Sequence, residues 1–426
     1  MNIIINLLLL IGDVISQLDS PVESKLVVSE ALNNILNVQY TVPIQILKSK
    51  LNMLVDIGSS NSWVQKNNIV NPNSDVVKRF DASLGYNEPL VSLLGYKTNI
   101  TIKGLTSFTV LGAPAQSVDL TTIYDGVLAL GPRSDFLIDI QYPSDNQKFG
   151  LYLGNYAEGD TSEITFGSYD QSKFSESSID SFQLVDSPAF LNSWAYESSS
   201  VTYTTKVNTT TIKSNVAFGK SFMMPSTITP FVILDEFTAR NINTDIGATY
   251  DATIGAFKIA CPGKNVLKTQ VQFNHGTFVY ELDSDQFILN YGNGVCVSGF
   301  NFVIDDPYPA IILGNVFLRY YYSMYDYNLK RISFSKAKHP KSPSSIVLAK
   351  MSIVKLIAEQ TKYQVAINQI TNKQFRAPEL VTQTDRLTQS LVPLLLSVLE
   401  NLSGNMTVLS GGAESIAGLK LYTPSI

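Results

Sequence analysis

From residue 40 to residue 335 the chain consists of short apolar or alternating segments separated by Gly, Asn, Asp and Pro. Examples are residues 40–46 (YTVPIQI), 98–102 (TNITI) and 332–334 (ISF). Alternation with a period of two residues is typical of a β-strand with one buried face, and long helical patterns are rare in this stretch. The pattern therefore predicts a mainly β body.

Composition limits the classes of function. The chain has 426 residues, 45% apolar and 16% charged, which excludes a disordered chain and leaves room for about two or three domains. The net charge of −5, from 31 basic and 36 acidic residues, argues against a nucleic-acid partner. His275 and His339 lie far apart in the sequence and there are only two cysteines, so we expect no metal centre. No glycine-rich phosphate or dinucleotide motif is present, so we expect no cofactor.

The amino terminus indicates the compartment. Residues 3–11 form a short apolar run that the small residue Ser16 follows, which predicts a signal peptide over residues 1–16. A buried N-terminal strand is the alternative, because the run lacks a preceding positive charge. No later apolar run reaches the roughly 18 residues that a transmembrane helix needs. We therefore expect a secreted, extracellular or cell-surface protein without a transmembrane segment.

Two further features fit this compartment. In an oxidising environment Cys261 and Cys296 would pair and stabilise the fold by roughly 3–4 kcal/mol; two buried free thiols are the alternative. Candidates for N-glycosylation are the Asn-x-Ser/Thr sequons at Asn99, Asn208, Asn401 and Asn405. Such tripeptides also occur by chance, so these positions are expectations only.

The chain divides into two similar parts and a different tail. Ser and Asp are dense near residues 175–200, and apolar strands ending at Gly131 (VLALG) and Gly314 (IILG) occur on either side. We therefore predict two β lobes, over residues 17–185 and 186–336.

Beyond these lobes we predict a linker and helical tail over residues 337–426. Residues 345–368 and 379–402 carry apolar side chains at helical spacing. Two helices packed on the β body are expected, and binding to a membrane surface is the alternative.

Residues 56–64 (DIGSSNSWV) resemble the first active-site motif of pepsin-like aspartic proteases, Asp-Thr-Gly-Ser-Ser followed by Trp-Val. Residues 125–131 (DGVLALG) and 312–321 (ILGNVFLRYY) resemble the apolar-Gly segments of the two lobes of that family. The cysteine pair falls where the family has its second-lobe disulfide. The resemblance covers roughly residues 35–336, and it implies a bilobal pepsin-like double β-barrel whose central cleft binds an extended peptide or protein.

In this family a water molecule is held between two Asp carboxylates, one from each lobe. They share one proton, because like charges ~3 Å apart cannot both ionise. One carboxylate then takes a proton from the water while the other donates to the scissile carbonyl. The resemblance assigns the first carboxylate to Asp56. The residues that it assigns to peptide binding are Gly58, Ser59, Tyr86, Thr227 and Thr229. For Tyr86, the expected flap residue, a core or turn position is the alternative.

The second motif departs from the family pattern. Counting back from residues 244–248 (TDIGA) without a gap, the family's Asp-Thr-Gly-Thr falls on residues 226–229 (STIT). Ser226 then stands where the second Asp is expected, and a hydroxyl without charge cannot share a proton with Asp56. Ile228 replaces the glycine, and a β-branched side chain would resist the positive φ expected there. We predict that catalysis is lost.

Asp235 is the alternative second acid. Measured to the glycine that ends each apolar strand, its spacing is 79 residues, against 75 for Asp56 and 88 for Ser226. However, no glycine follows Asp235, and residues 235–240 (DEFTAR) predict the start of a helix.

Three functions follow from these residues. The first is a secreted pseudoprotease whose cleft binds an extended peptide or protein without cleaving it. The second is an active aspartic endopeptidase that hydrolyses peptide bonds at acid pH with Asp56 and Asp235, or with Asp56 and a water held by Ser226. The third is an extracellular structural or interaction protein that uses the helical tail as its contact element.

Overall fold

The structure is a computed structural model, and the part of the chain that it describes is mainly β, as predicted. The described residues are 27–35, 37–65, 76–82, 91–114, 124–140, 147–155, 159–187, 190, 193–198, 201–207, 210–212, 217–218, 221–252, 255–261, 269–275, 278–290, 295–302 and 310–339. The predicted signal peptide and the predicted helical tail from residue 340 onward lie outside them.

Short strands follow one another along most of the described chain. The strands up to residue 166 are β1 (Val28–Ile35), β2 (Gln39–Ile46), β3 (Ser49–Asp56), β4 (Ser62–Val64), β5 (Val76–Ala82), β6 (Val91–Ile102), β7 (Leu105–Pro114), β8 (Gly126–Ala129), β9 (Lys148–Tyr152) and β10 (Ser162–Phe166). The later strands are β11 (Asp180–Gln183), β12 (Tyr196–Ser198), β13 (Val201–Val207), β14 (Thr210–Ile212), β15 (Ala217–Phe218), β16 (Ser221–Pro225), β17 (Val232–Leu234), β18 (Thr249–Asp251), β19 (Ala256–Ile259), β20 (Thr269–His275), β21 (Phe278–Asp283), β22 (Ile288–Asn290), β23 (Cys296–Ser298), β24 (Phe300–Phe302), β25 (Ala310–Leu313), β26 (Tyr321–Asp326) and β27 (Arg331–Lys336).

The helices of the described chain are short. They are α2 (Asp135–Asp139), α3 (Glu236–Asp245), α4 (Ser284–Phe287) and α5 (Asn315–Leu318), with 3-10 turns at η4 (Gln171–Lys173) and η5 (Glu176–Ser178). Among the described residues no helix is long and apolar enough to cross a membrane.

The strands obey the alternation that predicted them. In β2, Val42, Ile44 and Ile46 are buried while the intervening Pro43 and Gln45 are exposed. This arrangement is expected for a strand with one face on the core.

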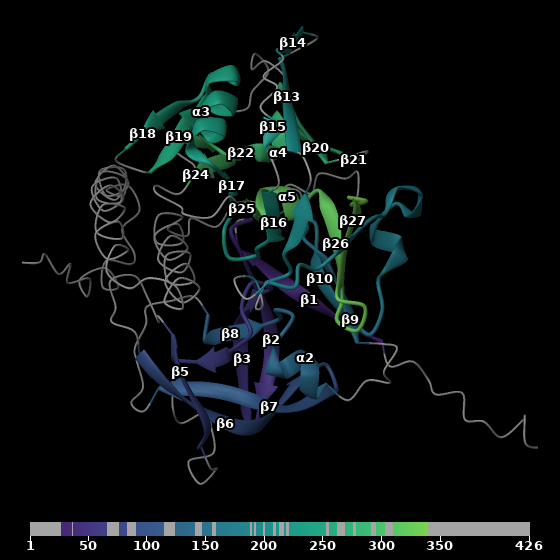
Figure 1. Ribbon diagram of the computed structural model, residues 1–426. Helices are drawn as coiled ribbons and strands as arrows, with labels where there is room; N and C mark the ends of the chain where they lie inside the picture. Colours follow the sequence, from purple (N-terminus) through teal and green to yellow (C-terminus); the bar gives the residue numbers. More distant parts are fainter. Residues whose placement is uncertain are drawn as a thin grey trace, which may run out of the picture.

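One large sheet joins the early and late parts of the chain. Its order is β11-β27-β26-β9-β10-β1-β2-β3-β8-β4-β7-β6-β5. Strand β26 pairs antiparallel with β9, with Ser323 opposite Leu151, so late strands are built into the same sheet as early ones. In Figure 1 these shared strands lie between β2–β8 below and α3 with β18 and β19 above. The boundary predicted between residues 185 and 186 stays a prediction.

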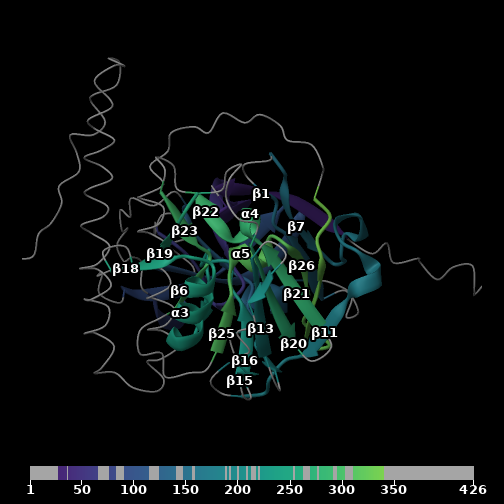
Figure 2. The ribbon, with the colours of Figure 1, turned by 90° about the horizontal axis from the view of Figure 1, so that it is seen from above.

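The upper part of the molecule holds the smaller sheets. A five-stranded sheet has the order β12-β16-β25-β17-β24. Seen from above in Figure 2, β16 and β25 lie in the middle, with α3, β18 and β19 to one side and β20 and β21 to the other. Residues 226–229, the expected second motif, directly follow β16 of this central sheet.

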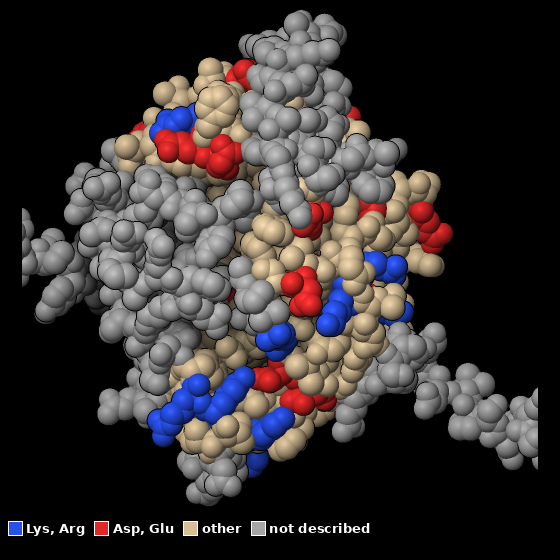
Figure 3. Space-filling model, in the orientation of Figure 1, with Lys and Arg blue, Asp and Glu red and all other residues tan. Residues whose placement is uncertain are grey.

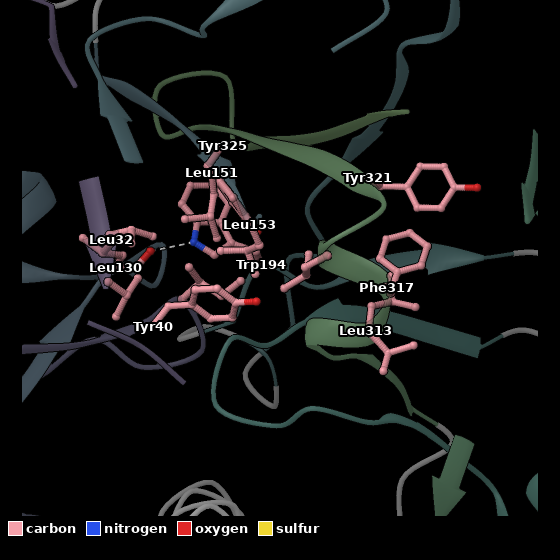
Figure 4. Packing of buried hydrophobic residues seen from close by; sticks show 14 of the residues in the cluster. Leu32, Tyr40, Leu130, Leu151, Leu153, Trp194, Leu313, Phe317, Tyr321 and Tyr325 are labelled. Carbon is pink, nitrogen blue, oxygen red and sulfur yellow. Dashed lines mark hydrogen bonds between the residues drawn. The ribbon is translucent and has the colours of Figure 1, made fainter. Parts of the chain in front are cut away.

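The core is continuous between the two parts. Trp194 is fully buried, and its indole Nε1–H donates to the Leu130 carbonyl at 2.7 Å (Figure 4). Tyr325 packs edge-on against Trp194, with ring centroids 5.1 Å apart, and stacks on Phe149 at 4.5 Å. These aromatic contacts unite residues from distant parts of the sequence in one packed cluster.

The predicted disulfide is confirmed. Cys261 and Cys296 are bonded across a sequence separation of 35 residues. Cys296 opens β23, opposite Ile259 of β19, so the bond closes the end of this small sheet.

The residues that follow β27 stay bound to the β body. His339 Nδ1 lies 2.8 Å from Asp160 Oδ2, and its Nε2 lies 2.6 Å from the Arg319 carbonyl oxygen. The Tyr152 hydroxyl donates to the same Asp160 oxygen at 2.6 Å. The Tyr152 hydroxyl also lies 2.9 Å from His339 Nδ1, so the three side chains form one hydrogen-bonded cluster. The predicted linker therefore does not leave the body before residue 339.

This cluster sets the titration of Asp160, whose side chain is 3% exposed. Burial acts to raise the pKa of this carboxyl, but hydrogen bonds from His339 and Tyr152 oppose it, aided by the charges of His339 and Lys173. The pKa of Asp160 therefore lies below its ordinary value of 3.8.

We expect H339Q to destabilise the protein by about 2–3 kcal/mol near neutral pH, because the buried Asp160 carboxylate loses the imidazole that it contacts. A carboxyl with a lowered folded pKa contributes stability above its unfolded pKa and loses it as the pH falls through the folded value. The difference in free energy of unfolding between wild type and H339Q should therefore decrease below about pH 4. Urea unfolding from pH 3 to pH 7 measures this, with the exposed K338Q as control. A stability difference that does not change with pH would contradict the lowered pKa of Asp160.

Candidate active site

Asp56 ends strand β3 and is fully buried. Strand β3 runs parallel to β8, which places Asp56 opposite Ala129. The Leu130 N–H donates to the Asp56 carbonyl oxygen at 2.7 Å, and the Gly131 N–H donates to the Ser59 carbonyl oxygen at 2.7 Å. These bonds hold the turn that carries the acid against the end of β8.

Gly58 lies against the Asp56 carboxylate. Its N–H donates to Asp56 Oδ1 at 2.8 Å, and a Cβ at position 58 would lie 3.3 Å from the same oxygen. Neither Gly58 nor Ile228 has a positive φ, so the expectation that this position of the motif needs a left-handed backbone is wrong. The constraint on Gly58 is its close approach to the carboxylate.

Thr227 connects the two motifs. Its hydroxyl donates to the Val55 carbonyl oxygen at 2.7 Å and accepts the Ile57 N–H at 3.3 Å, and the side chain is fully buried. Residues 226–229 therefore lie directly beside the Asp56 turn. The Ser226 N–H donates to the Leu313 carbonyl oxygen at 3.0 Å, which fixes this second segment on β25.

The two motifs occupy equivalent places in two similar strand arrangements. Adding 170 to the residue numbers of β4 gives those of β17. Each of the two strands pairs antiparallel with an apolar strand: Trp63 lies opposite Val127, and Ile233 lies opposite Ile312. Under the same shift Asp56 corresponds to Ser226 and Ile57 to Thr227.

The apolar strands are related by a different shift, of 185 residues from Val127 to Ile312. Gly314 then corresponds to Ala129, and the pairing of Gly131 with Gly314 in the sequence argument is wrong. At position 314 a Cβ would lie 2.1 Å from the Phe231 carbonyl oxygen, so glycine is needed in the second part of the chain. Measured to Ala129 the Asp56 spacing is 73 residues, still nearer to the 79 of Asp235 than to the 88 of Ser226, so the strand pairings and not the spacing relate Ser226 to Asp56.

Comparison with known proteins identifies this arrangement. The family model described as eukaryotic aspartyl protease matches residues 97–337, more than half of the chain. The chain belongs to the eukaryotic aspartyl protease family. The resemblance drawn from the motifs is confirmed at the level of the family.

Relatives of this protease homologue include vertebrate and fungal enzymes. Cathepsin E-A of Xenopus laevis is 27% identical over 345 residues, which cover 72% of this chain and 81% of the relative. Rhizopuspepsin-1 of Rhizopus niveus is 26% identical over 225 residues, and that match spans about half of each protein, 50% and 53%. The crystal structure of the aspartic proteinase from Irpex lacteus superposes with a TM-score of 0.59 at 19% identity, covering 75% of this chain and all of that one. The predicted bilobal pepsin-like fold is confirmed.

Asp235 of this protease homologue serves a local structural purpose. It is the N-cap of α3, where its Oδ1 accepts the Thr238 N–H at 3.0 Å, and it is exposed. The helix predicted to start at residue 235 is therefore observed. Under the 170-residue shift Asp235 corresponds to Gln65, which lies beyond the active-site turn.

The residues assigned to peptide binding fall into two groups. Gly58, Ser59, Thr227 and Thr229 lie in the two segments that Thr227 brings together, and the Thr229 hydroxyl accepts the Phe231 N–H at 3.2 Å. Tyr86 belongs to residues 83–90, which connect β5 to β6 and lie outside the described residues. Its assignment stays a prediction.

One residue of the site escaped the sequence analysis. The buried Asn315 amide donates to the Val38 carbonyl oxygen at 2.9 Å and to the Thr227 carbonyl oxygen at 3.0 Å. It therefore ties the second motif to the start of β2 from the opposite side. Its position directly after Gly314 was the available signal, since that glycine ends a strand at the site.

We expect T227V to lower the free energy of unfolding by about 2–3 kcal/mol, because both hydrogen bonds of the hydroxyl are lost while their partners stay buried. T227S keeps the hydroxyl and should lose much less. Chemical unfolding of the two variants measures the difference. Equal stability of T227V and wild type would show that the hydroxyl does not hold the motifs together.

Proposed function

We propose that this chain is a secreted, non-catalytic aspartyl protease homologue whose cleft binds an extended peptide or protein segment. The observation that carries the proposal is the Thr227 hydroxyl, which bonds to the backbone on either side of Asp56. This contact supports placing Ser226 where the family supplies its second carboxylate.

The replacement of one acid by a serine explains the proposed loss of activity. The serine hydroxyl cannot share a proton with Asp56 or alternate with it as acid and base. Losing one of two coupled proton-transfer groups costs at least about 10²–10⁴ in rate, and groups that act together lose more. Asp56 then remains as a single buried carboxylate.

Ile228 supports the same conclusion. It corresponds to Gly58, at which a Cβ would lie only 3.3 Å from Asp56 Oδ1. An isoleucine in this position would crowd a carboxylate held as that of Asp56 is held, whereas the shorter serine side chain fits. We infer that the serine at position 226 and the isoleucine at position 228 are sterically coupled, so that restoring a carboxylate at 226 also requires a glycine at 228.

Peptide binding does not need the second carboxylate. An extended ligand adds hydrogen bonds to exposed backbone and places alternate side chains in pockets. The turn at Gly58 and Ser59, Thr229, and Tyr86 as flap residue are the groups we assign to this contact. The exported location rests on the predicted signal peptide and agrees with the disulfide, which persists in oxidising compartments.

The active-enzyme alternative is less well supported. Catalysis by Asp56 with Asp235 would require the latter to abandon the α3 cap that it forms. A contact function of the helical tail concerns residues outside the described part of the chain and stays a prediction.

The test is a gain of function. Purified wild type should show no acid-pH cleavage of a fluorogenic peptide that family members hydrolyse. S226D alone should stay inactive because Ile228 blocks the new carboxylate, whereas S226D/I228G should cleave, with at least about a hundredfold higher rate. Adding D56N to the double variant should abolish that activity.

Two controls separate activity from binding and folding. All variants should unfold cooperatively, and wild type should still bind a transition-state-mimicking peptide, measured by calorimetry. Cleavage by wild type that D56N removes would overturn the proposal and restore the enzyme alternative.

A further inference from the structure

Strands β6 and β7 pair antiparallel along most of their length, and their side chains alternate between core and solvent. Thr98 and Ile100 on β6 are buried, as are Ser107 and Thr109 on β7. The side chains that face outward between and beside them are those of Lys97, Asn99, Thr101, Thr106 and Phe108.

Phe108 is an unusual residue for this outer face. Its side chain is 55% exposed. This is unfavourable, because removing a large apolar ring from water stabilises a protein. Lys97 Nζ lies 5.7 Å from the ring centroid and is also paired with Asp139 at 2.9 Å, so it meets the ring from one side. The rest of the ring faces solvent.

Asn99 is the residue directly opposite Phe108 in the pairing of β6 and β7. Directly opposed side chains have Cβ atoms about 4.5–5.5 Å apart, within contact distance of a group attached to either one. Asn99 is exposed and begins the tripeptide Asn99-Ile100-Thr101. The sequon and the exposed ring therefore share one face and one register position.

We propose that Asn99 carries an N-linked glycan whose first N-acetylglucosamine covers the Phe108 ring. The inference rests on the proposed export of the chain. The Asn99 Nδ2 displaces the pyrophosphate from C1 of a lipid-linked oligosaccharide: the N–C1 bond forms, the C1–O bond breaks, and the amide loses one proton. The C–H face of the sugar then packs on the aromatic face, as other apolar groups do.

The sequon is modified before β6 pairs with β7. In the folded chain Thr101 Oγ1 lies 3.0 Å from Thr106 Oγ1, so the hydroxyl that transfer requires is engaged in the sheet. If the sugar is transferred while the chain is still extended, the Thr101 hydroxyl is free for the transferring enzyme. It forms its contact with Thr106 afterwards, when β6 pairs with β7.

The sequon lies on different strands from the second active-site segment. In Figure 1, β6 and β7 lie at the lower end of the molecule, and β16, which leads into residue 226, lies in the upper half. On the face drawn in Figure 3, basic side chains gather over this lower end next to acidic ones, which agrees with the Lys78–Asp135 and Lys97–Asp139 ion pairs. A neutral, hydrated glycan is compatible with such a surface.

The experiment uses the full chain with N208Q, N401Q and N405Q, produced in glycosylating cells behind a foreign secretory leader. The secreted protein should shift in mobility on treatment with peptide-N-glycosidase, and adding N99Q should remove the shift. Secreted protein without a shift overturns the proposal. A parallel sample with the native amino terminus separates the two claims: failure of export there, with a glycan on the leader-driven protein, refutes secretion but not the site.

A second measurement tests the stacking. Removing the glycan should lower the midpoint of thermal unfolding by about 1–3 °C in the chain with Phe108. In F108S the same treatment should change the midpoint by much less. Equal shifts in the two proteins would show that the glycan does not cover the ring.

Discussion

The hydroxyl of Thr227 is the contact on which the arrangement of the site depends. It donates to the carbonyl before Asp56 and accepts the N–H after it, in a region from which water is excluded. Unpaired backbone groups at such depth are costly, so this contact fixes the two motifs in one relative position. The Asn315 amide, which reaches both Thr227 and Val38, reinforces that position from the second part of the chain.

Because the two motifs are held in one relative position, the residues that replace the family's Asp and Gly in the second motif can be compared directly with Asp56 and Gly58. Thr227 contacts the backbone on either side of Asp56, and the residue directly before Thr227 is Ser226. The close approach of Gly58 to the Asp56 carboxylate shows how little room the first motif allows, and Ile228 stands at the corresponding position of the second motif under the 170-residue shift. Under the proposed function, the scaffold of a peptide-binding cleft is retained while the proton-sharing pair is lost.

The strands could be predicted because alternation is a local pattern. The disulfide could be predicted because the chain has only two cysteines. Prediction from the sequence failed where the answer depends on how distant strands meet. The equivalence of Ala129 with Gly314 follows from pairing registers that no spacing reveals, and the role of Gly58 follows from a contact rather than from its φ. The contact of His339 with the buried Asp160 could not be predicted for the same reason, since the two residues lie far apart in the sequence. The helix start at Asp235, by contrast, was readable from a local capping pattern.

The most direct measurement is a crystal structure of the purified protein with a peptide mimic of the tetrahedral intermediate in its cleft. The account predicts that the central hydroxyl of the mimic meets one carboxylate, that of Asp56, and the hydroxyl of Ser226. A second carboxylate within hydrogen-bonding distance of that hydroxyl, from Asp235 or any other residue, would contradict it.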